Sequence, residues 1–418
     1  MANDDAPRGT TASDAAPDAA PVTPNAAPEA AARPDAGLGS EAVGLTAALV
    51  AIDSVNPGLV PGAAGEASVV AHLRDRLSHS GFATHVVEEP GLVGRPSLVA
   101  ISPTSAPGPT VVLTGHLDTV GVEGMADPFG ARVDGHRLEG RGSCDMKGGV
   151  AAMVVAAEEL ARRRVPGRVV LALVADEEDA SSGTLAVLDA LPGLGIEPDV
   201  AVIGEPTWLA LAQSLRGYAL VEVTLEGRAA HSSQPEQGVN AVAHLGRLLA
   251  AVESRGALVA EQGGSLMVTV ASGGESPFVL AQHATAIVER RTVPGERSEA
   301  ALAEVEHLLV HLRLHDDTVS ARARLVVARD PWQLDDSGPA AALAADLHRA
   351  LGDDAASEPF HAPYWMEAPL WQAAGIPTVV CGPAGGGLHA ADEWVDLHQV
   401  RRYTLALIEA VTTWGASA

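Results

Sequence analysis

Three consecutive carboxylates, Asp176, Glu177 and Glu178, follow an apolar run at residues 168–175. Adjacent carboxylates near a protein core repel one another, and each then favours its protonated form. A cation bound at this point removes the conflict. Such a triplet also occurs in solvated acidic loops, so the prediction of a metal site depends on how other strands end.

Three more apolar runs lead to metal-binding residue types at their carboxyl ends. The run at 110–114 precedes His116 and Asp118, the run at 199–203 precedes Glu205, and the run at 378–381 precedes His389. Short apolar runs bounded by Gly and Pro are typical of buried parallel strands. Because ligands bind beyond the carboxyl ends of strands in open α/β sheets, these residues predict a metal site at one sheet edge. The role of Asp176 within the triplet stays open.

Helical patterns alternate with these runs and complete the predicted framework. Helices are expected from about residue 40 to 52, at 65–80 and at 146–164. Such alternation predicts an α/β fold with a mostly parallel sheet and helices on both faces. Glu158 and Glu159 are adjacent in the last of these helices, and we expect them on its solvated face.

The pattern changes after Pro206. The expected order is strand, helix, strand, strand, helix, strand, at 218–226, 239–252, 266–271, 285–292, 297–312 and 320–327. This is the order of a ferredoxin-like domain, which we place as an insertion at 214–328 within a catalytic domain of residues 39–213 and 329–418. Residues 1–38 are rich in Ala, Pro and Asp with almost no large apolar side chain, so a disordered tail is expected.

Composition limits the partners and the compartment. The 418 residues carry a formal net charge of −26, which argues against nucleic acid or an anionic membrane surface as a partner. No apolar run approaches the roughly 18 residues of a membrane span, and the acidic start does not resemble a secretory signal. The two cysteines, Cys144 and Cys381, give no disulfide framework. We expect a cytoplasmic protein.

His116 and Asp118 stand two residues apart, so both side chains point the same way if the strand continues. A metal-bound imidazole usually donates its other N–H to a carboxylate, which favours His116 as ligand and Asp118 as its orienter, with a surface turn as the alternative.

Asp145 stands in the glycine-rich segment GRGSCDMKGG at 140–149. We expect this carboxylate to bridge two cations, beyond the plain role of a helix N-cap. Its neighbour Cys144 is expected to be a small packing residue.

Five segments resemble the dinuclear zinc amidohydrolase and peptidase family that includes acetylornithine deacetylase, succinyl-diaminopimelate desuccinylase, aminoacylase and a glutamate-releasing carboxypeptidase. They are TGHLDT at 114–119, GRGSCDMKGG at 140–149, ADEE at 175–178, IGEPT at 203–207 and the late His389. The segments follow the family's order, and the resemblance covers the chain from about residue 40 to its end.

The resemblance implies two divalent cations per subunit and a role for each ligand. One cation would be held by His116, Asp145 and Glu205, the other by Asp145, Glu178 and His389, with Glu177 as the general base. Zn²⁺ is expected, although a mixed set of His and carboxylate ligands also suits Co²⁺ or Mn²⁺. Two cations can activate a shared water and polarise a carbonyl, and a free carboxylate can carry the water's proton to a leaving amine.

The resemblance assigns two more residues, both in the inserted domain. His231, in GRAAHSSQP at 227–235, would reach the active site of a partner subunit and stabilise the oxyanion, which implies a homodimer. Arg291, in VERRTVPG at 288–295, would bind a substrate carboxylate. From the residues alone, His231 can be a turn histidine, Arg291 a solvent-facing strand residue, and Arg290 the functional arginine.

Two departures from the family pattern leave the substrate open. Phe278 stands where the family usually has Asn, and PYWMEAP at 363–369 replaces a Gly-Thr-Asp-like stretch. The expected activity is hydrolysis of an amide bond in an N-acyl amino acid. A dipeptidase or carboxypeptidase acting on a short peptide is the alternative within the family. A non-catalytic binding protein is the alternative from another class, but it should lack a ligand or the base, and none is missing here.

Overall fold

The computed structural model describes residues 35–104, 106–354 and 358–417. Most of the tail expected to be disordered, residues 1–38, lies outside the described residues. Residues 35–38 do not fit that expectation, because helix α1 (Asp35–Val50) already begins at Asp35. None of the described helices is long and apolar enough to cross a bilayer.

The central sheet has six strands in the order β1-β2-β6-β3-β7-β15. Its parallel core consists of β6 (Arg168–Val174), β3 (Thr110–His116), β7 (Val200–Ile203) and β15 (Thr378–Val380). β2 (Ser97–Ile101) runs antiparallel to both β6 and β1 (Ala83–Val87). The predicted α/β class with a mostly parallel sheet is therefore confirmed. The four strand ends that carry candidate ligands meet at one edge.

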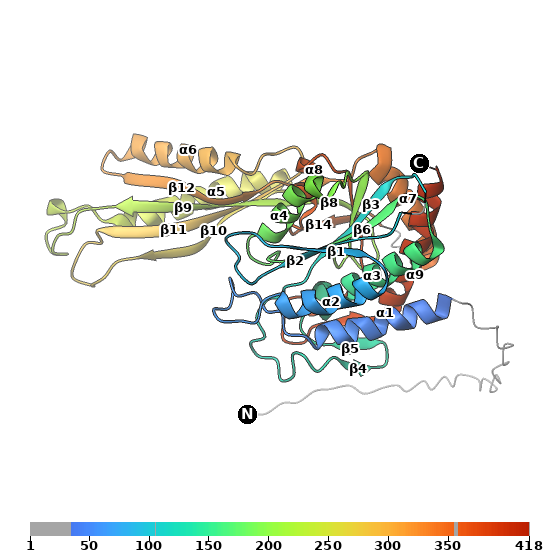
Figure 1. Cartoon of the computed structure of the whole chain (residues 1–418). Coiled ribbons are helices and arrows are strands. Elements are labelled where there is room, and N and C mark those ends of the chain that lie inside the picture. Colours follow the sequence, from blue (N-terminus) through green and yellow to red (C-terminus); the bar gives the residue numbers. More distant parts are fainter. Residues whose placement is uncertain (1–34, 105, 355–357, 418) are drawn as a thin grey trace, which may run out of the picture. The chain divides into compact units, whose positions relative to one another are not determined.

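Helices cover both faces of this sheet (Figure 1). On one face, Leu113 lies in a hydrophobic cluster with α1, α2 (Ala67–His79), α3 (Gly148–Arg163), α7 (Gly338–Leu351) and α9 (Leu397–Ser417). On the other face, Val112 lies in a cluster with α4 (Ser182–Ala190) and α8 (Ala368–Ala373). Because successive strand residues point to opposite faces, one strand stabilises both layers.

Residues 217–329 form the predicted βαββαβ unit. Its elements are β9 (Gly217–Glu226), α5 (Ala241–Glu261), β10 (Ser265–Gly273), β11 (His283–Thr292), α6 (Ala300–His315) and β12 (Ser320–Arg329). The four strands make an antiparallel sheet in the order β10-β11-β9-β12, with its own hydrophobic cluster. The ferredoxin-like arrangement is thus confirmed, whereas the domain boundaries at 214 and 328 stay a prediction.

Two small sheets bring together segments that are far apart in the sequence. One consists of β8 (Ala212–Leu215), β13 (Trp332–Gln333) and β14 (Phe360–Ala362). The other consists of β4 (Arg132–Asp134), β5 (Arg137–Glu139), β17 (Trp394–Asp396) and β16 (Gly385–Gly386). The second sheet pairs β5 with the β16–β17 hairpin. It therefore places the glycine-rich loop after β5 beside the loop that carries His389.

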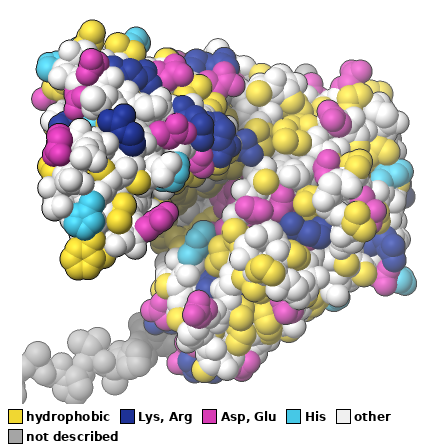
Figure 2. Space-filling view, turned by 90° about the vertical axis from the view of Figure 1, so that its left-hand side faces the viewer, with side chains coloured by type: hydrophobic (Ala, Val, Ile, Leu, Met, Phe, Trp, Pro, Cys, Tyr) yellow, Lys and Arg dark blue, Asp and Glu magenta, His cyan; other side chains and the backbone are white. Residues whose placement is uncertain are grey.

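Charged side chains of both signs share the surface. Figure 2 shows acidic and basic side chains interspersed on one face of the molecule. Exposed pairs such as Arg324 with Glu222, 3.1 Å apart, are each worth only about 0–1 kcal/mol. Because the two signs are interspersed, the net negative charge does not form a single patch on this face.

Candidate metal centre

His116 is the last residue of β3, and its side chain is buried, with 1% exposed. Its Nε2 lies 3.0 Å from Oδ1 of Asp145 and 3.9 Å from Oε1 of Glu205. Its Nδ1 lies 3.0 Å from the main-chain oxygen of Asp118, whereas the Asp118 carboxylate is 3.7 Å away. The sequence suggested the Asp118 carboxylate as the partner of this ring nitrogen. The nearer group is instead the main-chain carbonyl of Asp118.

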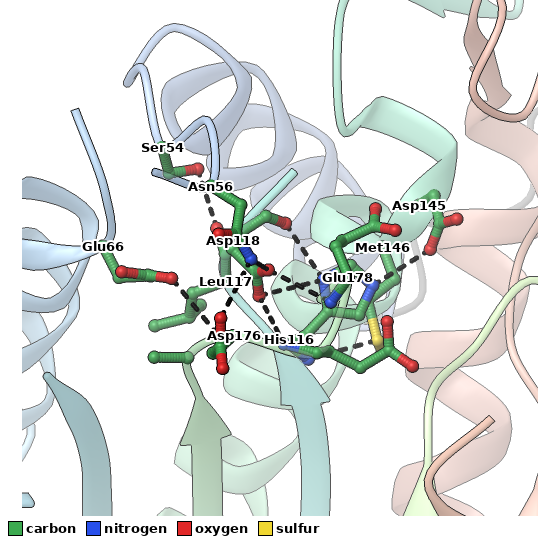
Figure 3. Close-up of polar contacts among 12 residues, drawn as sticks. Ser54, Asn56, Glu66, His116, Leu117, Asp118, Asp145, Met146, Asp176 and Glu178 are labelled. Carbon is green, nitrogen blue, oxygen red and sulfur yellow. Dashed lines mark hydrogen bonds and ion pairs between the residues drawn. The ribbon is translucent and has the colours of Figure 1, made fainter. Parts of the chain in front are cut away.

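Asp145 lies between two histidines. Figure 3 shows it beside His116, and its second oxygen, Oδ2, lies 3.2 Å from Nε2 of His389. The surrounding glycines allow this close packing: a Cβ on Gly149 would lie 2.1 Å from the carbonyl oxygen of Gly204. The loop after β5 and the start of α3 can therefore approach the end of β7 closely.

Two groups of three side chains converge on Asp145. They are His116, Asp145 and Glu205 in one group, and Asp145, Glu178 and His389 in the other. Within each group the potential ligand atoms all lie within 4.8 Å of one another. These groups are the two triads that the sequence resemblance implies, and they share one carboxylate. Their roles as cation ligands stay a prediction.

Glu177 lies beside the triads and belongs to neither. Its backbone N–H donates to Oδ1 of Asp118 at 3.1 Å, and the N–H of Glu178 donates to Oδ2 at 3.2 Å. The Asp118 carboxylate therefore holds the turn on which both glutamates stand. Burial raises the pKa of Glu177 well above its ordinary value, and the nearby carboxylates of Glu205 and Glu367 add to that shift.

Asp176 belongs to a buried polar network next to this turn (Figure 3). Arg95 donates from Nη1 to Asp176 at 2.8 Å and makes two hydrogen bonds to Glu66, at 2.7 and 3.0 Å. Nδ2 of Asn56 donates to Asp118 at 2.7 Å and to Asp176 at 3.2 Å. Asp176 thus supports Asp118 through a shared amide. No sequence pattern pointed to Asn56, Glu66 or Arg95, because none of them follows a strand of the parallel core.

Glu393 is a second buried carboxylate that sequence reasoning missed. Its oxygens accept hydrogen bonds from Nη1 of Arg141 at 2.5 Å and from the backbone N–H groups of Gly142, Cys144 and Asp145 at 2.9–3.1 Å. It stands four residues after His389, on the same β16–β17 hairpin. This closeness to a predicted ligand is the one signal by which the sequence points to it.

The charge balance of the centre favours bound cations. Burial and the Asp145 carboxylate raise the pKa values of Glu178 and Glu205. Hydrogen bonds to Asp145 and Glu178 raise the pKa of His389 to about 10. Oε1 of Glu178 is buried without a hydrogen-bond partner among the described residues, which is costly for a carboxylate. Since His nitrogens and carboxylate oxygens are ligands that Zn²⁺ accepts, the residues present fit two divalent cations.

His231 is not brought to this centre within the chain. It is exposed beyond the end of β9, where its Nδ1 lies 2.8 Å from the Ser233 hydroxyl. The ten residues of β9 span about 30 Å, so His231 lies far from the end of β9 that adjoins β8 (Figure 1). The exposed Phe278 is its neighbour there, since the backbone N–H of Ser232 donates to the Phe278 oxygen at 2.9 Å.

The two adjacent arginines of β11 face different surroundings. Arg290 is buried and forms ion pairs with Glu296 at 2.8 Å and Glu304 at 3.0 Å. Arg291 is half-buried on the other face, where its Nε donates to Glu289 at 2.5 Å and its Cζ lies 5.2 Å from the centre of the Tyr218 ring. Arg290 therefore stabilises the inserted domain, and of the two only Arg291 lies on the helix-free face.

The unusual segment at 363–369 packs against the centre. The Tyr364 hydroxyl donates to the carbonyl of Pro206 at 3.3 Å, next to Glu205. Glu367 is buried, and it accepts a hydrogen bond from the Thr184 hydroxyl at 2.7 Å. Both side chains belong to the stretch PYWMEAP, which departs from the Gly-Thr-Asp-like stretch of the family pattern.

Comparison with known proteins agrees with the family resemblance of the sequence segments. Residues 112–413 match the family model described as Peptidase family M20/M25/M40. Acetylornithine deacetylase from Myxococcus xanthus is 28% identical over 358 residues, which cover 82% of this chain and 91% of that protein. Succinyl-diaminopimelate desuccinylase 2 from Ruegeria sp. is 36% identical over 218 residues, which cover 50% of this chain and 53% of that protein. The second match thus spans about half of each protein.

A solved structure extends the comparison to the fold. A dinuclear metal-binding peptidase of the M20 family from Bacillus subtilis superposes with a TM-score of 0.70 at 15% identity, covering 92% of this chain and 100% of that one. At this level of identity, the match concerns the fold alone.

Proposed function

The chain belongs to peptidase family M20/M25/M40, a family of metal-dependent hydrolases, and on that premise we propose that it deacylates an N-acyl amino acid at a two-metal centre. The observation that carries the proposal is that Asp145 belongs to both triads, while Glu177, the neighbour of Glu178 in the sequence, belongs to neither. This arrangement supplies protein ligands for two cations while leaving one carboxylate free for proton transfer.

Glu177 is the proposed general base. When bound, two divalent cations lower the pKa of a shared water and polarise the scissile carbonyl. Glu177 takes the proton of the attacking water and passes it to the leaving amine. Burial raises the pKa of Glu177, which suits a carboxylate that must hold this proton for part of the cycle. The Asp118 carboxylate positions Glu177 by accepting a hydrogen bond from the backbone N–H of Glu177.

Zn²⁺ is the cation we propose, because each triad offers one imidazole and two carboxylates. The same ligands accept Co²⁺ or Mn²⁺. Metal analysis of the protein purified without chelators tests the proposal, and about two equivalents per chain are expected. Less than one equivalent after reloading would favour a non-catalytic protein with this fold.

The relative from Myxococcus xanthus, which is named an acetylornithine deacetylase and matches over most of both chains, supports an N-acyl amino acid as substrate. Cleavage of a dipeptide or of a C-terminal residue is the competing proposal, since the matched family model is that of a peptidase family. A panel of N-acetyl amino acids and dipeptides separates the two, because the better substrate class should be hydrolysed with the higher kcat/KM.

We further propose a cytoplasmic homodimer that pairs through the inserted domain at 214–328. The span of β9 supports this assignment, because it keeps His231 away from the centre of its own chain. The two cysteines are free and buried, which suits a reducing compartment.

Glu177→Gln tests the proposed base. We expect kcat to fall by roughly 10²–10⁴-fold while two cations stay bound. Asp179→Asn is the matched control, because Asp179 is exposed on the same turn, and it should retain activity. A Glu177→Gln variant that hydrolyses every substrate at the wild-type rate would remove Glu177 from the mechanism.

A further inference from the structure

Tyr218, the second residue of β9, stands in one cross-strand row with two arginines. The strand register pairs it with Arg291 on β11 and with Arg329 on β12. Directly paired residues point to the same face of a sheet. The next residue, Ala219, is buried in the cluster beneath the helices. Tyr218 and the two arginines therefore lie on the helix-free face.

The ring of Tyr218 is fixed from two sides. Its centre lies 6.2 Å from that of Trp365 in an edge-on arrangement of 84°, and Arg291 approaches it at 5.2 Å. Trp365 is itself held by a hydrogen bond from Nε1 to the carbonyl of Asp330 at 3.2 Å. The position of the phenol is thus set by contacts that do not involve its hydroxyl.

The hydroxyl of Tyr218 has no hydrogen-bond partner among the residues that the structure describes. Partly buried phenols usually find one, and the Tyr364 hydroxyl does so at Pro206. Burial raises the pKa of Tyr218, the Arg329 cation opposes this, and the charge of Glu177 adds to it. The hydroxyl therefore keeps its proton at neutral pH, and it lies within electrostatic reach of the proposed base.

The row carries a net positive charge. Among the described residues, Arg291 is paired only with Glu289 and only through Nε, so its terminal nitrogens stay available as donors. Arg329 forms no ion pair with any described residue, and its Nη2 donates to the carbonyl of Ala180 at 2.8 Å, on the turn after Glu177 and Glu178. An anionic group next to Tyr218 would therefore be attracted, and a protonated phenol could donate to it.

We propose that the Tyr218 hydroxyl binds substrate directly, donating a hydrogen bond beside Arg291 to a free carboxylate on the amine half of the amide. This inference rests on the proposed function and adds a substrate-binding residue to it. Amides whose amine half carries a free carboxylate are substrates, and those in which that carboxylate is blocked are poor ones. The phenol adds a neutral donor to the charge of Arg291 and so fixes the direction of the carboxylate.

Tyr218→Phe tests this role, because it keeps the ring and its contacts with Trp365 and Arg291. The probes are N-acetylornithine and its α-carboxamide. We expect the variant to lose about tenfold or more in kcat/KM for the acid, as for other hydrogen bonds to charged groups. The loss for the carboxamide should be smaller, roughly two- to fivefold, because its carbonyl oxygen accepts only a neutral hydrogen bond. Equal losses for both probes, or no loss for the acid, would overturn the proposal.

Tyr403→Phe is the matched control. Tyr403 is buried in α9, and its hydroxyl also lacks a partner among the described residues, so this variant should match wild type with both probes.

Calorimetric binding of N-acetylornithine separates the inference from the proposed function. If wild type binds the acid without hydrolysing it, the deacylase proposal fails, while about tenfold weaker binding by Tyr218→Phe still supports the phenol's role. Equal binding by both proteins, or binding by neither, rejects that role.

Discussion

Oε1 of Glu393 accepts the backbone N–H of Asp145 at 3.1 Å. The same oxygen accepts the N–H of Cys144 at 2.9 Å, and Oε2 accepts that of Gly142 at 3.0 Å. Glu393 stands on the hairpin that carries His389, so a single buried carboxylate links that hairpin to the loop of Asp145, the residue that the two triads share. The geometry of both triads therefore depends on this residue.

Glu393→Gln should weaken cation binding by about 10–100-fold, the usual effect of losing a group that orients metal ligands. The amide replaces one acceptor oxygen with an NH₂ group that faces backbone N–H donors. Titration of the chelated protein with Co²⁺, followed by visible absorption, measures the affinity. Asp392→Asn, at the exposed neighbouring position, should bind normally, and normal affinity in a folded Glu393→Gln protein would refute the role.

Arg95→Met should lower the free energy of unfolding by about 3–5 kcal/mol, because it leaves the buried carboxylates of Glu66 and Asp176 without their shared cation. Urea denaturation measures this loss. Arg74→Met is the control, since the Arg74 side chain is 48% exposed and should cost little. A loss no larger than that of the control would show that the network contributes nothing measurable.

The stability of the chelated protein should depend on Glu367 above neutral pH. Burial raises the pKa of Glu367 from 4.5 to about 7, so the folded chain prefers the protonated acid. This contribution is present below pH 4.5 and is lost as the pH rises through 7. Glu367→Gln stays neutral and should be about 2–3 kcal/mol more stable than wild type at about pH 8. Near pH 4.5 the difference should be small.

Urea denaturation at the two pH values checks this expectation. Glu261→Gln, at an exposed position of α5, controls for the general effect of removing a negative charge. The same stability difference at both pH values would mean that Glu367 does not titrate in this range.

Two inactive variants should restore activity when combined, if His231 serves the partner's centre. A mixed dimer of Glu177→Gln and His231→Ala chains contains one centre with an intact base and an intact histidine. Refolding the two together should therefore recover about a quarter of the wild-type activity in a two-fold symmetric dimer. Each variant refolded alone is the control, and activity no greater than their mean would place His231 outside the partner's centre.

Lys147 should resist amine reagents in the folded protein. It is the only lysine of the chain, it is buried, and its Nζ donates to the carbonyl of Ile52 at 2.8 Å. Burial also lowers its pKa to about 8. Intact-mass analysis after acetylation should show no lysine modification in the native protein and one after unfolding in guanidinium. Modification of Lys147 at equal rates in both states would contradict its burial.

The metal centre could be located from the sequence because its signals are local. Each ligand follows a short apolar strand or a glycine-rich loop within a few residues, and strand direction alone brings such ends together. The supporting residues carry no local signal. Asn56 and Asp176 are 120 positions apart, and Glu393 and Cys144 are 249 apart, so only the folded chain reveals that they meet.

The burial of individual side chains was also hard to predict from the sequence. Glu158 and Glu159 were expected on a solvated helix face, and this is wrong. Glu159 is 5% exposed and pairs with Arg162 and Arg163, both at 2.6 Å, while Glu158 pairs with Arg76 at 2.6 Å. Helix α3 packs against α1 and α9, and a period of apolar residues does not show how far those neighbours reach around it.

The two imidazoles of the centre differ in their access to solvent: the side chain of His116 is 1% exposed and that of His389 is 53% exposed. Cations held by the two triads should therefore exchange with solution at different rates. A chelator would empty the triad of His389 first, and the inner triad would follow slowly. The protein would then pass through a long-lived state with a single ion on its way between the fully loaded and empty forms.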